Sequence, residues 1–112
     1  SAHIARFLND SGVICCASFV APNADSREHA ISVIGKDNCY IIYLNPPIET
    51  CILRDPSGLY AAAEGTESTD IPGLSFPYSA PEVTQLELDT SALSVDECLE
   101  KVLKLMRDEE II

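Results

Sequence analysis

The sequence is poor in positive charge. Only 7 of its 112 residues are Lys or Arg, against 18 Asp and Glu, and the formal net charge is −11. Nucleic-acid binding needs clustered cations that neutralise phosphates, so a nucleic-acid partner is not expected. An anionic nucleotide remains compatible with this balance, because helix N-termini and one or two arginines can hold it.

Long apolar runs are also absent. No run approaches the roughly 18 residues that a membrane-spanning helix needs, and no charged segment precedes an apolar one at the N-terminus as in a signal peptide. No membrane partner is therefore predicted, and a cytoplasmic location is expected. The hydrophobic content of 46% is enough for the core of one domain, or of a piece of one, over residues 1–112.

The sequence also lacks paired cysteines and any recognisable group of catalytic residues. The five cysteines are odd in number and irregularly spaced, without a C-x-x-C pair. On a strand, adjacent Cys15 and Cys16 would point to opposite faces and could not share a metal. Buried thiols of a reducing compartment are predicted instead. Because no triad or paired carboxylate stands out either, no catalytic or metal-binding residue is assigned.

Apolar residues at helical spacing, together with cap residues, predict helices. Ser26 is expected to cap the second helix, Gly35 to end it, and the sequence Ser94-Val95-Asp96-Glu97 to open the last helix as a capping box. The predicted ranges are 2–10, 26–34, 48–53, 60–64 and 95 onward.

Two almost wholly apolar runs, residues 13–20 and 39–44, predict strands that are buried on both faces. Residues 85–89 alternate between polar and apolar and predict a strand nearer the sheet edge. Helices and strands that alternate in this way indicate an α/β fold with a parallel sheet and right-handed crossovers. The polar residues 66–72 are expected to form a mobile loop.

Several short motifs, in order and at the right spacing, resemble the adenylylsulfate (APS) kinase family. Residues 6–15 (RFLNDSGVIC) resemble that family's AKLFADAGLVC, residues 18–22 (SFVAP) its SFISP, and residues 26–28 (SRE) its DRD. Residues 54–60 (RDPSGLY) resemble RDVKGLY or RDPKGLY, and residues 77–82 (PYSAPE) resemble PYEAPE. The chain thus looks like the C-terminal two-thirds of such a kinase, with a lid-like loop over residues 61–76.

The resemblance implies a P-loop kinase-like fold, here incomplete, with a parallel sheet and helices on both faces. It implies transfer of the γ-phosphoryl group of ATP to adenylylsulfate, which yields PAPS for sulfate assimilation. ATP and Mg are implied as cofactors only if a complete kinase domain exists. An adenylyl nucleotide is the small-molecule partner that the resemblance suggests.

The resemblance also assigns site residues. The substrate-binding positions are Phe19, Val20, Ala21, Arg27, Ser57, Asp70 and Ile71, and the nucleotide-binding positions are Arg54 and Ala92. Two assignments have alternatives. Arg27 either holds a sulfate or phosphate group or pairs with Glu28 or Asp25 at the surface. Arg54 either contacts the nucleotide or forms an anchoring ion pair with Asp55.

The chain departs from the family pattern in two places. No G-x-x-x-x-G-K-[ST] phosphate loop occurs in these residues. In the lid, Ser57, Ala61, Ala62 and Thr69 stand where Lys is expected, Glu64 where Arg is expected, and Ile71 where a stacking Phe is expected. The prediction is therefore an isolated chain that is inactive as a kinase. The alternative is a non-catalytic, kinase-like regulatory, nucleotide-binding or interaction domain.

The missing segment has a topological consequence. In kinases of this type the strand before the phosphate loop lies between the two strands predicted here at residues 13–20 and 39–44, so its absence leaves two unpaired strand edges. Such edges must find partners. The expectation is that a missing N-terminal segment, a fused domain or a second chain fills this space, unless the two strands close up.

Overall fold

The sheet of this protein is short and parallel. The computed structural model describes residues 1–64 and 70–112, and its sheet pairs β1 (Ile42–Leu44) with β2 (Leu86–Leu88). Ile42 lies opposite Leu86 and Leu44 lies opposite Leu88. The α/β class with a parallel sheet is confirmed. In a sheet of two strands both lie at an edge, so the predicted edge position of residues 85–89 stays a prediction.

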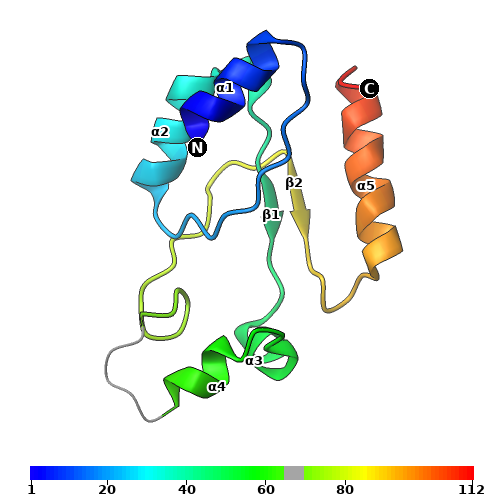
Figure 1. Ribbon diagram of the computed structural model, residues 1–112. Helices are drawn as coiled ribbons and strands as arrows, with labels where there is room; N and C mark the ends of the chain where they lie inside the picture. The colour runs from blue at the N-terminus through cyan, green and yellow to red at the C-terminus, as the bar shows by residue number, and fades with distance from the viewer. Residues whose placement is uncertain (65–69) are drawn as a thin grey trace.

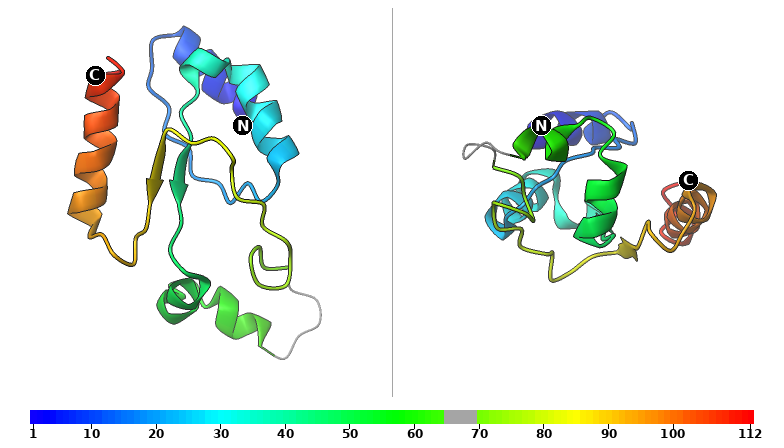
Figure 2. Two further views of the ribbon diagram at one scale, coloured as in Figure 1. Left: turned by 180° about the vertical axis from the view of Figure 1, so that it is seen from behind. Right: turned by 90° about the horizontal axis from the view of Figure 1, so that it is seen from below.

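Helices surround this small sheet without covering it (Figure 1). Their bounds are α1 (Ala2–Asp10), α2 (Ala24–Ile34), the 3-10 turn η1 (Lys36–Asn38), α3 (Ile48–Arg54), α4 (Leu59–Ala63) and α5 (Val95–Asp108). Figure 2 shows α1 and α2 together on one side, α5 standing apart beyond β2, and α3 and α4 past the end of β1. Among the described residues, no helix is long and apolar enough to cross a membrane.

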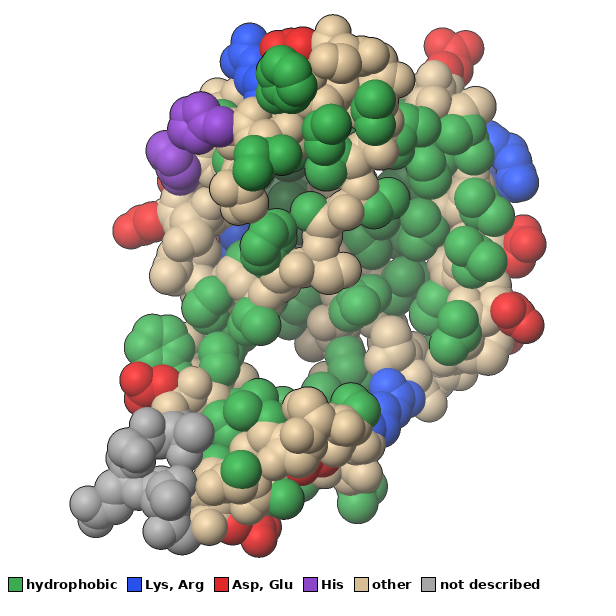
Figure 3. Space-filling model, viewed as in Figure 1, with side chains coloured by type: hydrophobic (Ala, Val, Ile, Leu, Met, Phe, Trp, Pro, Cys, Tyr) green, Lys and Arg blue, Asp and Glu red, His purple; other side chains and the backbone are tan. Residues whose placement is uncertain are grey.

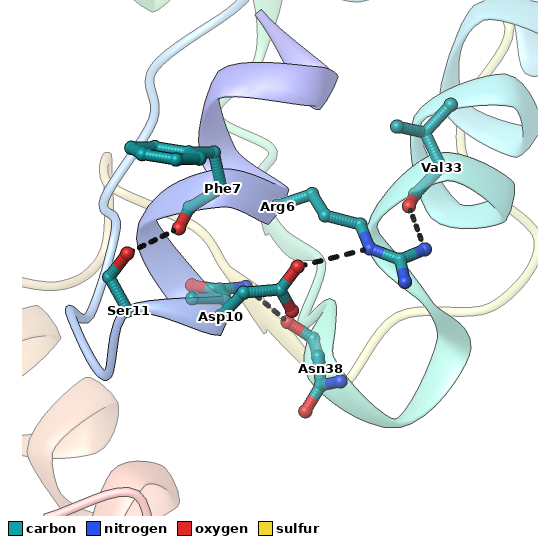
Figure 4. A network of polar contacts seen from close by, with 7 residues as sticks. Arg6, Phe7, Asp10, Ser11, Val33 and Asn38 are labelled. Carbon is teal, nitrogen blue, oxygen red and sulfur yellow. Dashed lines mark hydrogen bonds and ion pairs between the residues drawn. The ribbon is translucent and has the colours of Figure 1, made fainter.

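Helix α1 is tied to α2 and to the 3-10 turn η1 by polar contacts (Figure 4). The Arg6 guanidinium donates to the Val33 carbonyl at 3.0 Å, and the Asn9 side-chain amide donates to the Asn38 carbonyl at 3.5 Å. Arg6 also pairs with Asp10 at 3.6 Å, but both side chains are exposed, so this ion pair contributes little. The two backbone carbonyls therefore fix the packing of α1 more than the ion pair does.

Helix α2 begins earlier than predicted. Asn23, not Ser26, is its N-cap, and the Asn23 side-chain oxygen accepts a hydrogen bond from the Ser26 N–H at 2.9 Å. Asn and Ser serve equally well as N-caps, so composition does not decide between them. The predicted end is confirmed, since the helix stops at Ile34 and Gly35 follows with φ 102°.

The largest correction concerns residues 13–20, which form no strand. Phe19 is 68% exposed and Val20 is 61% exposed, although the sequence predicts burial on both faces. A strand exists only where a neighbour completes its ladder of hydrogen bonds, and no described segment does this here. The second predicted strand, residues 39–44, is reduced to β1, and its Leu44 is 59% exposed.

The core is correspondingly small. Of the described residues only Ile71 and Leu88 are fully buried hydrophobic side chains. The Cα radius of gyration is 15.8 Å, whereas a compact domain of this length would have about 13 Å. The prediction of buried thiols is wrong as well, because Cys16 is exposed and the other cysteines are only partly covered.

The capping box at the start of α5 is confirmed. The Ser94 hydroxyl accepts from the Glu97 N–H at 3.2 Å, and a Glu97 carboxylate oxygen accepts from the Ser94 N–H at 2.7 Å. Hydrogen bonds from Ser94 hold the pKa of Glu97 below its ordinary value, because they favour the ionised carboxylate.

This geometry predicts a pH dependence of the first turn of α5. Because the pKa of Glu97 is lowered on folding, its stabilising contribution is present above the ordinary Glu pKa and is lost as pH falls through the lowered value. Protection of the α5 first-turn amides, measured by hydrogen exchange between pH 7 and 3, should fall in that window. Glu97→Gln should remove this part of the pH dependence, and Glu100→Gln, on the same helix, should keep it. Equal behaviour of the two variants would contradict the prediction.

Candidate functional site

A cavity of about 670 Å³ lies next to the sheet, between segments that are distant in the sequence. Its walls come from residues 17–20, from β1 and the following residues 45–48, and from Tyr60 and Tyr78. In the space-filling view an opening is visible between the upper part of the molecule and the part that carries α3 and α4 (Figure 3). Phe19 and Val20, two of the predicted substrate-binding residues, line this cavity.

Arg27 holds the loop that leads into α2. Its guanidinium donates to the Ala21 carbonyl at 2.6 Å and is partly buried. Ala21 has φ 41°, a left-handed conformation that is unfavourable for a residue with a side chain. The predicted surface pairing of Arg27 with Glu28 or Asp25 is absent from the described ion pairs. Arg27 thus keeps further N–H donors for an anion beside this loop.

Two tyrosines close one side of the cavity. Tyr43 and Tyr78 stack with ring centroids 6.2 Å apart and an interplanar angle of 8°. The Tyr43 hydroxyl donates to the Asn45 side-chain oxygen at 3.0 Å. Burial, followed by the neighbouring Tyr78 and Glu87, raises the pKa of Tyr43, and Arg27 opposes this shift.

The segment that follows the lid-like loop is fastened to the same region. The Ser79 N–H donates to the Pro22 carbonyl at 2.8 Å, next to the loop that Arg27 holds. Ile71 is only 2% exposed, and its carbonyl accepts the N–H groups of residues 74, 75 and 76 in a tight turn. The Ile71 side chain is therefore covered in this arrangement, while Asp70 beside it is exposed.

Arg54 forms a second cluster, away from the cavity. Its guanidinium donates to the Thr90 hydroxyl at 2.9 Å and to the Thr90 carbonyl at 2.6 Å. The loop after β2 is tight here, because the Ala92 N–H donates to the Asp89 carbonyl at 3.2 Å. Arg54 and Ala92, which the resemblance assigns to nucleotide binding, are thus brought to the same loop.

The alternative of an Arg54–Asp55 ion pair is wrong. The Asp55 carboxylate accepts the N–H groups of Tyr60 and Ala61 at 3.1 and 3.0 Å and so begins α4. Asp55 adopts φ 20°, which turns the chain between α3 and α4. The two neighbours therefore anchor different elements. Arg54 holds the loop after β2, and Asp55 holds the start of α4.

Asp89 orders the loop that Arg54 contacts. The Asp89 carboxylate accepts hydrogen bonds from the Ser91 N–H and hydroxyl. These bonds, with a smaller effect of the Arg54 charge, lower the pKa of Asp89. The loop between β2 and α5 is thus held by Asp89 from within and by Arg54 from α3.

The structure gathers only some of the predicted site residues. Ala21 lies on the loop that continues from the cavity-lining residues Phe19 and Val20, and Arg27, on α2, donates a hydrogen bond to the carbonyl of Ala21. Ser57 is exposed in the turn between α3 and α4, and neither it nor Asp70 lines the cavity. The lid residues 65–69, which include Thr69 and most of the loop predicted to be mobile, lie outside the described residues. Within residues 1–64 and 70–112 no group of three His, Cys, Asp or Glu side chains is placed to hold a metal ion.

Sequence reasoning missed Tyr43 and Thr90. Tyr43 belongs to an apolar run that predicts a strand, and nothing in that run distinguishes it as a cavity residue. Thr90 lies 36 residues from Arg54 in the chain. No local pattern signals such a contact, so it could only be found from the fold.

The short parallel sheet and the helices around it define a chain of the α/β class, and comparison with known proteins identifies its family. The model of the adenylylsulphate kinase family matches residues 1–89. The chain belongs to this family.

Individual relatives agree with that assignment. The adenylyl-sulfate kinase of Bacteroides thetaiotaomicron is 40% identical over 105 residues, which cover 94% of this chain and 52% of the relative. The bifunctional enzyme CysN/CysC of Rhodopirellula baltica is 37% identical over 107 residues, 96% of this chain and 16% of that protein. An adenylyl-sulfate kinase of Prochlorococcus marinus is 36% identical over 100 residues, 89% of this chain and 50% of the relative. The chain spans about half the length of the adenylyl-sulfate kinases it matches.

The double contact of Arg54 with Thr90 makes a prediction about the loop after β2. Arg54→Met removes both hydrogen bonds and should lower the free energy of unfolding by about 1 kcal/mol, since exposed charged bonds contribute little more than neutral ones. Amide exchange at Ala92 and Leu93 should become faster. Arg54→Lys should recover only part of the loss, because an ammonium group lacks the planar fork of guanidinium.

Arg107→Met is the matched control. Arg107 is an exposed arginine of α5, and its side chain makes no hydrogen bond or ion pair with another described residue. That substitution should leave both the unfolding free energy and the exchange at Ala92 unchanged. If Arg107→Met and Arg54→Met have the same effect, the loss reflects net charge and not the contact with Thr90.

Proposed function

We propose that this chain is part of an adenylyl-sulfate kinase domain of sulfate assimilation and acts in the cytoplasm. In this proposal it carries the loops that hold the sulfonucleotide and needs further polypeptide for phosphoryl transfer from ATP. The names of the relatives support the reaction, and the family match supports the fold. The observation that carries the proposal is that the loop at residues 18–22 is bonded both by Arg27 and by Ser79, which follows the lid-like loop.

Arg27 is the residue proposed to hold the anionic part of the substrate. The residue is partly buried, and its bond to Ala21 fixes the direction of its guanidinium. A guanidinium group has five N–H donors, so the remaining ones can bind sulfate or phosphate oxygens as a pair. Phe19 and Val20 would then form the apolar wall beside the nucleotide, where they line the cavity.

Arg54 and Ala92 are proposed to hold the second nucleotide. Both belong to the cluster around Thr90, where the loop after β2 meets α3. In this proposal, Arg54 first orders the loop through Thr90 and then offers its charge and its planar face to the nucleotide. Ser57, Asp70 and Ile71 keep their inherited assignment to the substrate only if the lid rearranges, because Ile71 is covered here.

Phosphoryl transfer requires more positive charge than these residues provide. The reaction depends on cations that meet the charge on the transferred phosphoryl oxygens. At the lid positions the chain has Ala61, Ala62 and Glu64 where the family pattern has basic residues, and its net charge is −11. We assign no magnesium ligand among the described residues and no catalytic step to them. The isolated chain is therefore expected to bind a sulfonucleotide weakly and to produce no PAPS.

Titration calorimetry tests the binding part of this proposal. Adenylylsulfate, PAPS and ADP are titrated separately into the wild-type chain, and we expect heat with at least one of the two sulfonucleotides. Arg27→Ala should weaken that binding at least tenfold, the usual effect of losing a charged hydrogen bond of about 1.4 kcal/mol or more. Arg107→Ala, which removes the same charge from exposed α5, should leave it unchanged. Heat that is equal in wild type and Arg27→Ala would contradict the role of Arg27.

A second candidate is a non-catalytic, kinase-like regulatory or interaction module. It is favoured by Glu64 and Asp70, two exposed acidic residues within the lid-like loop. Negative charge there opposes the approach of phosphate groups. Sulfonucleotide binding without PAPS formation, even when the rest of a kinase domain is supplied, would select this candidate. Absence of binding to all three nucleotides would leave only the interaction role.

A further inference from the structure

The loop before α2 is attached to the rest of the described chain at two adjacent carbonyl groups. The Ala21 carbonyl accepts from the Arg27 guanidinium at 2.6 Å. The Pro22 carbonyl accepts from the Ser79 N–H at 2.8 Å, and no other group of residues 14–22 is hydrogen-bonded within the described chain. Ala21 has φ 41°, and a residue with a side chain keeps such a conformation only where its surroundings hold it. The placement of this loop therefore depends on what fixes Arg27 and Ser79.

Ser79 belongs to the segment of residues 77–84, which follows the lid-like loop and passes the loop before α2 (Figure 1). This segment forms no helix or strand, and Pro77 and Pro81 have no N–H to donate. Ser79 is its only backbone donor with a partner in the part of the chain that the structure describes. The segment can thus hold the loop only if another contact fixes the segment itself.

The Tyr78 side chain supplies that contact. Its ring stacks on the ring of Tyr43, with centroids 6.2 Å apart and an interplanar angle of 8°, within the range of favourable offset pairs. Both tyrosines are half-buried, and Tyr43 is the middle residue of β1. The stack therefore joins the segment of residues 77–84 to the sheet.

Tyr43 is itself held in one direction on the sheet. In an extended chain, side chains two residues apart point to the same side, and the Tyr43 hydroxyl donates to the Asn45 side-chain oxygen at 3.0 Å. The Asn45 side-chain amide donates in turn to Glu87 at 2.8 Å, next to its strand partner in β2. An ionised carboxylate only accepts, so Glu87 fixes which end of the Asn45 amide faces Tyr43. A chain of contacts thus runs from β2 to the ring that carries Tyr78.

We propose that Tyr43 is a positioning residue for the sulfonucleotide site. Through its stack on Tyr78 it fixes Ser79, and through Ser79 it fixes the Pro22 carbonyl and the loop that Arg27 contacts. The identity of the ligand rests on the proposed function, whereas the placement of the loop does not. In this role Tyr43 acts through Tyr78 and needs no contact with the substrate. Without the stack, the loop keeps only its bond to Arg27, and the two can move together relative to the sheet.

Amide exchange of the chain without nucleotide, measured by NMR, tests the first step. Tyr43→Leu keeps an apolar side chain but removes the ring, and we expect the Ser79 amide to exchange about tenfold faster because its segment opens locally. Tyr40→Leu is the matched control, since Tyr40 is also half-buried, precedes β1 and lies outside the stack. It should leave Ser79 unchanged. The Gly35 amide, hydrogen-bonded at the end of α2, reports general unfolding, so each effect is measured at Ser79 relative to Gly35.

Two further variants test the two rings separately. Tyr43→Phe keeps the ring and loses only the bond to Asn45, so it should raise the Ser79 exchange rate less than Tyr43→Leu does. Tyr78→Leu removes the other ring without altering β1, so it tests the stack independently of any damage to the sheet. Because the two rings act as one contact, the double variant Tyr43→Leu/Tyr78→Leu should exchange no faster at Ser79 than either single variant.

The second step is measured at Arg27. Rotation of its guanidinium group, followed by NMR of the chain labelled with 15N-arginine, should become roughly threefold faster in Tyr43→Leu, because the Ala21 carbonyl is no longer held in place. Arg54, which donates two hydrogen bonds to Thr90, is the internal control and should be unchanged. Adenylylsulfate should then bind Tyr43→Leu roughly threefold or more weakly than wild type, since a loosened site must be ordered on binding. Tyr40→Leu should bind like wild type.

Each outcome decides the proposal or the function on which its ligand rests. Faster exchange at Ser79 in Tyr43→Leu and Tyr78→Leu, together with faster rotation at Arg27, supports the proposal. Unchanged exchange in both variants overturns it, and so does an equal effect of Tyr40→Leu. Unchanged rotation of Arg27, or unchanged affinity of Tyr43→Leu for adenylylsulfate, overturns the positioning role. Absence of heat with the wild-type chain counts against the proposed function alone, because exchange and rotation are measured without nucleotide.

Discussion

Backbone hydrogen bonding is the constraint on which the rest of this structure depends. Ile42 and Leu44 turn their peptide groups away from β2, and residues 14–20 have no ladder at all. Because polar peptide groups stay in water when no partner is present, the apolar side chains attached to them stay exposed as well. The small core around Ile71 and Leu88 follows from this one deficit.

The unpaired peptide groups also affect the candidate site. Phe19 and Val20 belong to the unpaired segment, and they line the cavity that separates it from β1. The loop that follows is nevertheless held, because Arg27 and Ser79 both bond its carbonyl groups. This loop is therefore ordered at its far end, by contacts that do not need the sheet's hydrogen bonds.

Sequence reasoning succeeded where the interactions are local. Helix α1, the end of α2 at Gly35 and the Ser94–Glu97 capping box all depend on residues within four positions of one another. It failed at residues 13–20, where an apolar run predicts a buried strand but burial needs a neighbour elsewhere in space. The sequence also predicted unpaired strand edges, and the absence of a strand at residues 13–20 agrees with that second inference and not with the prediction of burial on both faces.

At the candidate site, too, the sequence identified single residues but not the distant partners that they contact. Arg54 was singled out by its motif, but its true partner is Thr90, and the adjacent Asp55 serves a different element. A motif identifies residues that a family uses, whereas the fold decides which of them can act together. Here the Ala21 carbonyl fixes the direction of the Arg27 guanidinium, and Arg54 is committed to the loop after β2. Because the two arginines lie on separate elements, α2 and α3, only the fold sets how they lie relative to each other, and neither motif by itself encodes it.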